Sequence, residues 1–178
     1  MKVINTKFKD LKIIQHKKHG DSRGYLRETF RKKIIKWDKL IFDYATTSKK
    51  NVLRGFHFQY KFKQSKYVTV LKGKILDCVI DLRKRSKTFG KSFKIILSKE
   101  NAISLFIPRG FAHAYYSFEE ENIIYYKLDN FYKPKYEHGI IHNDKKIKIK
   151  WPKRKMIVSK KDKKLKSFQN FCETFGSL

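Results

Sequence analysis

Two histidines in apolar segments, His57 and His113, are the residues of this sequence best suited to chemistry. Histidine can bind a metal ion or move a proton near neutral pH. Their neighbours do not complete a metal site, because Gln59 follows His57 by two positions and Lys66 is itself a cation. Such a set offers too few ligands for a four-coordinate metal. What remains is a base beside a fixed positive charge, which suits removal of a proton from carbon and stabilisation of the resulting anion.

The spacing of these residues is similar to the metal site of a small β-barrel of the cupin type. Such barrels carry His-x-His and a downstream Glu in a first segment and Pro-x-Gly-x-x-His in a second. The second segment is complete at residues 108–113 (PRGFAH). In the first, Gln59 stands where the second His would be, and Lys66, seven residues before Gly73, stands where the Glu would be. We therefore expect a barrel pocket that holds no metal.

The strand around His57 decides which residues share its face. His57 and Gln59 alternate onto one face, whereas Arg54 points to the other unless a bulge at Gly55 turns it. Glycine suits such a bulge. A lone histidine in a strand is most often a packing or surface residue, but its coincidence with Lys66 and the second histidine segment favours a functional role.

Tyr126 and Asp162 are two further candidates. Tyr125 and Tyr126 are adjacent on a predicted strand, so their side chains face opposite sides and one of them enters the barrel. A tyrosine there either packs with a hydrogen-bonded hydroxyl or donates a proton across the pocket from His57. Asp162, at the end of Ser-Lys-Lys-Asp, has the local pattern of a helix cap.

Short β-rich runs separated by turn residues dominate the chain and predict a sandwich or barrel. The clearest strands are 42–47, 52–58, 67–71, 75–82, 93–97, 103–107 and 123–128. Gly73 predicts a tight hairpin between two of them. Short helices are expected at 31–40 and 161–171. We expect an all-β fold in one domain, residues 1–178, with 163–178 as a peripheral tail.

One predicted strand carries Phe42, Tyr44, Thr46 and Ser48 on a single face, two aromatic residues followed by two hydroxyls. That face either belongs to the core or lines the mouth of the barrel. The sequence leaves both interpretations open.

The chain has 178 residues, of which 44 are Lys or Arg and 16 are Asp or Glu, giving a net charge of +28. Such a charge ordinarily indicates nucleic-acid binding. The basic residues are mostly lysines scattered along every segment, and no helix-turn-helix, zinc-finger or ribonucleoprotein pattern accompanies them. We interpret the charge as solvated surface that attracts anionic substrates, and expect no specific nucleic-acid partner.

The apolar runs are too short to span a bilayer, and the N-terminus has no apolar signal region. We therefore expect a cytoplasmic protein without a membrane partner. Cys78 and Cys172 are far apart in different surroundings, so we expect two free thiols.

Several segments, in order across residues 10–165, together resemble the dTDP-4-dehydrorhamnose 3,5-epimerase family. They include GDSRG at 20–24, NVLRGFHFQ at 51–59, DLR at 81–83, IPRGFAH at 107–113, YK at 126–127, ND at 143–144, WP at 151–152 and Ser-x-x-Asp at 159–162. Each segment is weak alone, but the ordered set is specific.

The resemblance implies a cupin jelly roll that works as a homodimer, with N-terminal strands exchanged between subunits and without metal or other cofactor. It implies that His57 is the catalytic base and that Asp162 is the carboxylate that orients it. It also implies that Tyr126 is the acid on the opposite face and that Lys66 is the cation that stabilises the enolate. It also implies substrate contacts from Arg23, Glu28, Phe42, Tyr44, Arg54, Gln59, His113, Tyr132, Glu137 and Lys161. The substrate would be a nucleotide-diphosphate 4-keto sugar, whose keto group acidifies the protons on carbons 3 and 5.

The chain departs from the family pattern near the sugar and nucleoside. Phe42 and Tyr44 stand where Gln and Asn are usual, and His142 stands where Trp is usual. We expect conversion of the dTDP-4-dehydro-6-deoxyglucose to dTDP-4-dehydrorhamnose type, for surface-polysaccharide precursors. An epimerase of carbon 3 alone, or one for a GDP- or CDP-linked sugar, is the nearest alternative. A non-catalytic cupin that binds anionic glycans or nucleic acid is the alternative from another class, and it leaves the catalytic set unexplained.

Overall fold

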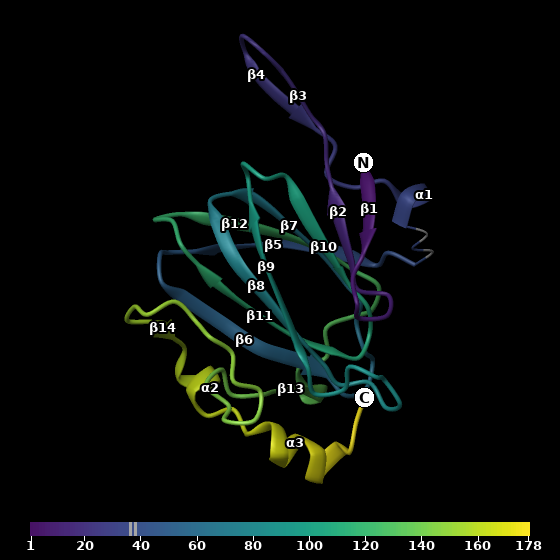
Figure 1. Ribbon diagram of the computed structural model, residues 1–178, viewed down its shortest axis with the longest axis vertical. Helices are drawn as coiled ribbons and strands as arrows, with labels where there is room; N and C mark the ends of the chain where they lie inside the picture. Colours follow the sequence, from purple (N-terminus) through teal and green to yellow (C-terminus); the bar gives the residue numbers. More distant parts are fainter. Residues whose placement is uncertain (36, 38) are drawn as a thin grey trace.

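The computed structural model describes residues 1–35, 37 and 39–178, and two antiparallel sheets facing each other form its body (Figure 1). The first sheet has the strand order β1 (Lys2–Asn5), β2 (Lys12–Gln15), β10 (Ile103–Ile107), β7 (Lys66–Lys72), β12 (Asn122–Leu128) and β5 (Phe42–Ser48). The second has the order β13 (Glu137–Gly139), β6 (Val52–Gln59), β11 (Phe111–Ser117), β8 (Lys74–Asp81) and β9 (Ser92–Ser98), and β14 (Ile157–Val158) runs parallel to β6. A separate hairpin pairs β3 (Lys18–Asp21) with β4 (Gly24–Arg27).

Alternation along the strands decides which side chains fill the barrel. On β12, Ile124, Tyr126 and Leu128 are buried, and the residues between them are partly exposed. They pack in one cluster with residues of the second sheet, among them Val79 and Leu97. The core therefore lies between the sheets, which confirms the all-β cupin jelly roll. The seven predicted strands are all present, with ends displaced by no more than one residue.

The sequence did not predict β11 or the short strands β1 to β4, β13 and β14. All seven residues of β11 are buried, so no alternation of polar and apolar residues marks it. The other six strands have two to four residues each, too few to establish a period.

The predicted hairpin at Gly73 was wrong in one respect. Gly73 has the expected positive φ, +78°, in a tight turn between β7 and β8. The two strands belong to opposite sheets, however, and β7 pairs with β10 and β12 instead. The turn is therefore a connection between the sheets. A Cβ at this position would lie 2.5 Å from the Asn122 side-chain oxygen, so the chains pass too closely for a larger residue.

The C-terminal helix predicted at 161–171 is two helices, α2 (Lys160–Lys163) and α3 (Phe168–Phe175), capped by Ser159 and Ser167. Phe168 and Phe171 pack with Phe58 on the outer face of the second sheet. Residues 163–178 are thus fastened to the barrel beside β6 (Figure 1).

The helix predicted at 31–40 is only α1 (Lys32–Ile35), and positions 36 and 38 of that prediction lie outside the described residues. Among the helices of the described chain, none has the length and apolar character to cross a membrane. Cys78 and Cys172 are both free thiols, as expected.

The bulge predicted at Gly55 is present. Arg54 and His57 of β6 pair with Tyr115 and His113 of β11, so three steps along β6 match two along β11. Gly55 lies in this irregularity with φ +111°. As a result Arg54 and His57 line the same cavity although they are three positions apart, a spacing that places side chains on opposite faces of a regular strand.

We predict that Gly55→Ala costs about 3 kcal/mol or more, because backbone strain and overpacking add. The new methyl would lie 2.5 Å from the His113 carbonyl oxygen and 2.7 Å from the Ala114 Cα. Urea unfolding measures the loss. Gly176→Ala is the matched control, since Gly176 also has a positive φ but no atom lies within 4 Å of the added carbon; it should cost about 1 kcal/mol. Equal losses would show that the bulge tolerates a side chain.

Candidate active site

His57 of β6 is paired with Asp162 of α2, which lies 105 positions later in the chain. Nε2 of His57 is 2.8 Å from Oδ1 of Asp162, and the Gly55 amide donates to Oδ2 of the same carboxylate at 3.1 Å. The Asp162 side chain is buried, whereas that of His57 is 27% exposed. Since Nε2 faces the carboxylate, Nδ1 is the nitrogen left to accept a proton.

The Asp162 carboxylate remains charged in spite of its burial. Burial alone raises the pKa of Asp162, but the hydrogen bond and charge of His57, together with the Gly55 amide, lower it below its usual value. The helix-cap interpretation of Asp162 was wrong, because Ser159 is the cap and accepts a hydrogen bond from the Asp162 amide. The cap leaves the Asp162 side chain available to fix one tautomer of His57.

A second histidine–carboxylate pair lies next to the first. His113 is directly opposite His57 across β6 and β11, and its Nε2 is 2.8 Å from Oδ2 of the buried Asp77. Burial raises the pKa of Asp77 against the opposing effects of His113 and Lys66. Burial also lowers the pKa of Lys66, against the effects of Glu137 and Asp77. A cation in such surroundings acts strongly on nearby negative charge.

Tyr126 of β12 faces the barrel interior and is 3% exposed, which confirms that one of the two adjacent tyrosines enters the barrel. Its ring stacks on that of Tyr44, with centroids 4.8 Å apart. Burial raises the pKa of Tyr126 well above its usual value, and Tyr115 and Tyr44 add to the effect. The phenol is therefore protonated near neutral pH and can donate a proton.

Two adjoining cavities form one cleft around these residues. The outer cavity, about 310 Å³, is lined by Phe42, Tyr44, His57, Gln64, Lys66, Leu128, Tyr132 and Glu137. The inner cavity, about 200 Å³, is lined by Tyr44, Thr46, Arg54, His57, Lys66, His113, Tyr115 and Tyr126. Tyr44, His57 and Lys66 belong to both. The strand face with Phe42 and Tyr44 thus lines the mouth of the barrel.

Glu137, Tyr132 and Lys161 form a linked group at the cleft. The Glu137 carboxylate accepts hydrogen bonds from the Tyr132 hydroxyl at 3.0 Å and from the Lys161 ammonium. Burial raises the pKa of Glu137, but Lys161, His57 and Tyr132 together lower it below its usual value. The group therefore presents a charged carboxylate and an exposed cation beside the outer cavity.

Gln59 is buried and fastens the loops at the rim. Its amide nitrogen donates to the carbonyl oxygens of Phe62 at 2.8 Å and Phe131 at 3.2 Å, and its oxygen accepts from the Lys133 amide at 2.6 Å. Both polar atoms of the Gln59 side chain are therefore engaged in hydrogen bonds within the protein. In the described part of the chain, Gln59 supports the cleft without lining it.

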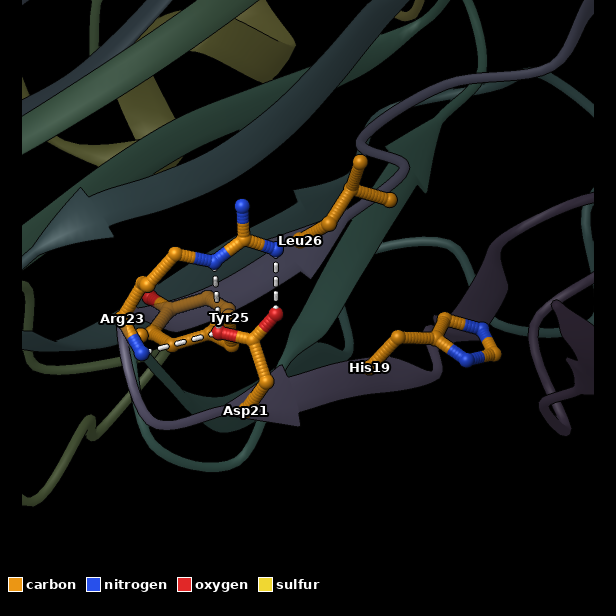
Figure 2. A pocket seen from close by; sticks show the side chains of 6 residues that line it. His19, Asp21, Arg23, Tyr25 and Leu26 are labelled. Carbon is orange, nitrogen blue, oxygen red and sulfur yellow. Dashed lines mark hydrogen bonds and ion pairs between the residues drawn. The ribbon is translucent and has the colours of Figure 1, made fainter.

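Arg23 and Glu28 lie apart from the cleft within this chain. Arg23 is at the turn of the β3–β4 hairpin, which extends away from the barrel (Figure 1), and its guanidinium pairs with the Asp21 carboxylate at 2.6 Å (Figure 2). Glu28 pairs with Arg31 at the surface. These two predicted substrate contacts therefore cannot reach the same chain's His57 from where they stand.

The sequence reasoning missed Tyr115, which lines the inner cavity, and Asp77, which is buried behind the cleft and pairs with His113. The Tyr115 hydroxyl lies 2.8 Å from the Ser48 hydroxyl and 3.2 Å from that of Thr46. A usable signal existed for Asp77, because it interrupts the apolar run 75–80, and a buried carboxylate requires a partner. Tyr115 carried no such signal.

The cleft has the parts needed to move protons at carbon. His57, paired with Asp162, can accept a proton. Tyr126 can donate one, and Lys66 lines the same cavity as both. Over residues 1–35, 37 and 39–178, no group of three or more His, Cys, Asp and Glu side chains could hold a metal ion. Deprotonation next to a carbonyl, with Lys66 stabilising the enolate, is the chemistry that this set supports.

Comparison with known proteins decides the family. The model of the family "dTDP-4-dehydrorhamnose 3,5-epimerase" matches residues 5–170. The chain belongs to this family. Over 168 residues it is 39% identical to the dTDP-4-dehydrorhamnose 3,5-epimerase of Shigella flexneri, covering 91% of this chain and 93% of the relative. It is also 39% identical to the enzyme of that name from Methanothermobacter thermautotrophicus, covering 92% of each. Like these relatives, the protein is an isomerase.

A solved structure agrees with this assignment. The Legionella pneumophila dTDP-6-deoxy-D-glucose-3,5-epimerase, in complex with dTDP-4-keto-L-rhamnose, superposes with a TM-score of 0.89 at 36% identity, covering 93% of this chain and 92% of that one. The cupin-type barrel of this family is therefore also the fold of the present chain.

We predict that Asp162→Asn lowers stability by about 2 kcal/mol at neutral pH, the typical contribution of hydrogen bonds to a charged group. The folded pKa of Asp162 is lowered, so its charge stabilises the fold above the unfolded pKa, and this stabilisation is lost as pH falls through the folded value. The difference between parent and variant should therefore shrink below about pH 4. Urea unfolding of both proteins from pH 7 to pH 3 tests this, and a difference that does not depend on pH would contradict it.

Proposed function

We propose that the protein epimerises a dTDP-linked 4-keto-6-deoxy sugar at carbons 3 and 5, in a conversion of the dTDP-4-dehydro-6-deoxyglucose to dTDP-4-dehydrorhamnose type. The main support is one cleft lined by a carboxylate-paired histidine, a buried protonated tyrosine and a lysine. Family membership and the ligand of the Legionella relative support the nucleotide-linked substrate. The product would be a precursor of surface polysaccharide.

The proposed reaction runs through an enolate. Nδ1 of His57 removes the proton from the carbon next to the keto group. The C–H electron pair forms the carbon–carbon double bond of the enolate, and the π pair of the carbonyl moves onto its oxygen. Lys66 stabilises the negative oxygen. Tyr126 then donates its hydroxyl proton to the opposite face of that carbon while the carbonyl re-forms, and the phenolate and imidazolium return to their starting states by exchange with water. The same two proton transfers then take place at the second carbon.

The energetic demand is shared between two effects. A positioned acid or base typically contributes about 10²–10⁴-fold in rate, and a preorganised charge at a developing oxyanion about 10²–10³-fold more. The charged Asp162 contributes to the first effect, because it stabilises the imidazolium that His57 becomes. The lysine contributes to the second effect, because burial leaves little water around Lys66 to screen its charge.

We further propose that the enzyme is a homodimer in which the β3–β4 hairpin of each chain reaches the partner's cleft. The hairpin extends from the barrel and exposes Tyr25 and Leu26, at 42% and 67% (Figure 1). Such exposed apolar side chains on a projecting arm favour burial against another chain. In this arrangement Arg23 and Glu28 contact substrate that is bound by the partner's His57.

Deuterium uptake from solvent separates the two proton transfers. We predict that His57→Ala abolishes both uptake and net epimerisation, because it removes the base that Asp162 orients, whereas His113 is bound to Asp77 and Glu137 to Lys161. Tyr126→Phe should abolish net epimerisation and retain uptake at the original face. Mass spectrometry of a panel of dTDP-, GDP- and CDP-linked 4-keto sugars measures uptake and also counts the centres that exchange.

Uptake by His57→Ala at the parental rate would refute the base assignment. Exchange at carbon 3 alone would identify a single-centre epimerase. Tight, sequence-selective nucleic-acid binding with no exchange on any sugar of the panel would favour the non-catalytic alternative.

We predict that inactive Arg23→Ala and His57→Ala chains, mixed under conditions of subunit exchange, regain about a quarter of parental activity, because half of the dimers are mixed and each has one intact site. Size-exclusion chromatography confirms the dimer, and each variant alone serves as the control. If both residues acted within one chain, mixing would restore no activity.

A further inference from the structure

Three aromatic rings form a row along the inner face of the first sheet, from Phe42 through Tyr44 to Tyr126. The centroids of Phe42 and Tyr44 are 6.0 Å apart with planes inclined by 27°, and those of Tyr44 and Tyr126 are 4.8 Å apart with planes inclined by 21°. The register produces the closer contact, because Tyr44 of β5 lies directly opposite Tyr126 of β12. Directly opposed side chains in a sheet are the pairs that interact most strongly.

Tyr44 covers one face of the Tyr126 ring. Tyr44 is 38% exposed and lines both cavities of the cleft, whereas Tyr126 is 3% exposed and lines only the inner one. His113 meets the Tyr126 ring edge-on from the second sheet, with centroids 6.0 Å apart. Between them Tyr44 and His113 limit how far the Tyr126 ring can tilt or slide.

Water at the cleft mouth meets Tyr44 before it meets Tyr126. Burial is the largest influence that raises the pKa of Tyr126, followed by Tyr115 and Tyr44. Removal of the Tyr44 ring would open a path for water to the phenol and would free one face of its ring. Both changes act directly on the group that returns the proton. The His57–Asp162 pair keeps its hydrogen bond, because His57 lies on the second sheet and Asp162 on α2.

We propose that Tyr44 is a positioning residue for proton return: its ring holds the Tyr126 phenol in place and keeps it dry, so that the proton is delivered to one face of the enolate. The inference rests on the proposed epimerase function. It assigns to Tyr44 a role other than substrate binding. Loss of a residue that only binds the substrate would slow proton removal and proton return equally, whereas loss of a residue that positions Tyr126 would slow mainly proton return.

The test compares three variants with the parent on the dTDP-linked 4-keto sugar. Tyr44→Asn removes the ring, Tyr44→Phe keeps the ring without its hydroxyl, and Tyr125→Asn makes the same change as the first on the outward face of β12. Each is assayed for solvent deuterium uptake and for net epimerisation, with kcat and KM determined separately. Thermal unfolding checks that every variant is folded.

We expect Tyr44→Asn to lower the kcat of net epimerisation at least about tenfold while uptake falls less than about threefold, because only part of the positioned proton transfer is lost. Its ratio of uptake to epimerisation should thus approach that of Tyr126→Phe. Tyr44→Phe should keep the parental ratio of uptake to epimerisation, since stacking needs only the ring. Tyr125→Asn should leave the ratio unchanged.

The pH profile gives a second readout. Tyr126 must be protonated to act, so net epimerisation is lost as pH rises through its pKa, and wetting the phenol lowers that pKa toward its usual value. The ratio of net epimerisation to uptake in Tyr44→Asn should therefore fall at a lower pH than in the parent. Deprotonation of Lys66, whose pKa is lowered by burial, affects both activities and leaves this ratio unchanged. The other titratable side chains around Tyr126 are His57 and Arg54 on β6, Lys66 on β7, Asp77 on β8, and His113 and Tyr115 on β11, and all remain in the variant.

Equal losses of uptake and epimerisation in Tyr44→Asn, or a change confined to KM, would overturn the positioning role. So would a ratio of epimerisation to uptake that falls at the same pH in Tyr44→Asn as in the parent. A parent that neither exchanges nor epimerises the sugar would instead refute the proposed function, so the two failures are distinguishable.

Discussion

The buried carboxylate of Asp162 is the constraint on which the rest of the site depends. A charge withdrawn from water must be compensated by hydrogen bonds and an opposite partner. Here the compensation comes from His57 and from the Gly55 amide, so the β6 bulge serves two purposes at once. It brings Arg54 and His57 to one cavity, and it contributes a backbone donor to the carboxylate that orients the histidine. The C-terminal segment, fastened by Phe168 and Phe171, delivers Asp162 to that position.

The two sheets divide the cleft between them. The second sheet carries His57, His113 and Asp77, and the first carries Tyr44, Lys66 and Tyr126. The proposed base and the proposed acid therefore lie on facing layers, which in packed sheets are about 10 Å apart. A sugar ring bound between the two layers would have the histidine on one face and the phenol on the other. For inversion of a carbon centre, removal and return of a proton must come from opposite sides, and this architecture suits that demand.

The central strands, the bulge and the presence of His57 in the cleft were predictable, because each left a local pattern or an ordered set of motifs in the sequence. Alternation marked β12, and glycine in an apolar run marked the bulge. β11 left none, since burial on both faces removes alternation. The turn at Gly73 was visible, but whether its strands pair depends on partners far along the chain. The pairing of Asp162 was accessible only through resemblance, because Ser159 and Asp162 alone indicate a helix start.

The same long-range pairings determine when the molecule can become active. β2 pairs with β10, β6 pairs with β11, and the last partner of His57 arrives 105 residues after it. Contacts of such sequence separation form slowly, because the chain must close large loops before these strands gain their neighbours. A nascent chain that ends before α2 therefore has its barrel strands and its histidine but no carboxylate to orient it. If His57 and Asp162 act together as proposed, proton exchange at the sugar reports on the docking of α2 as well as on the folding of the barrel.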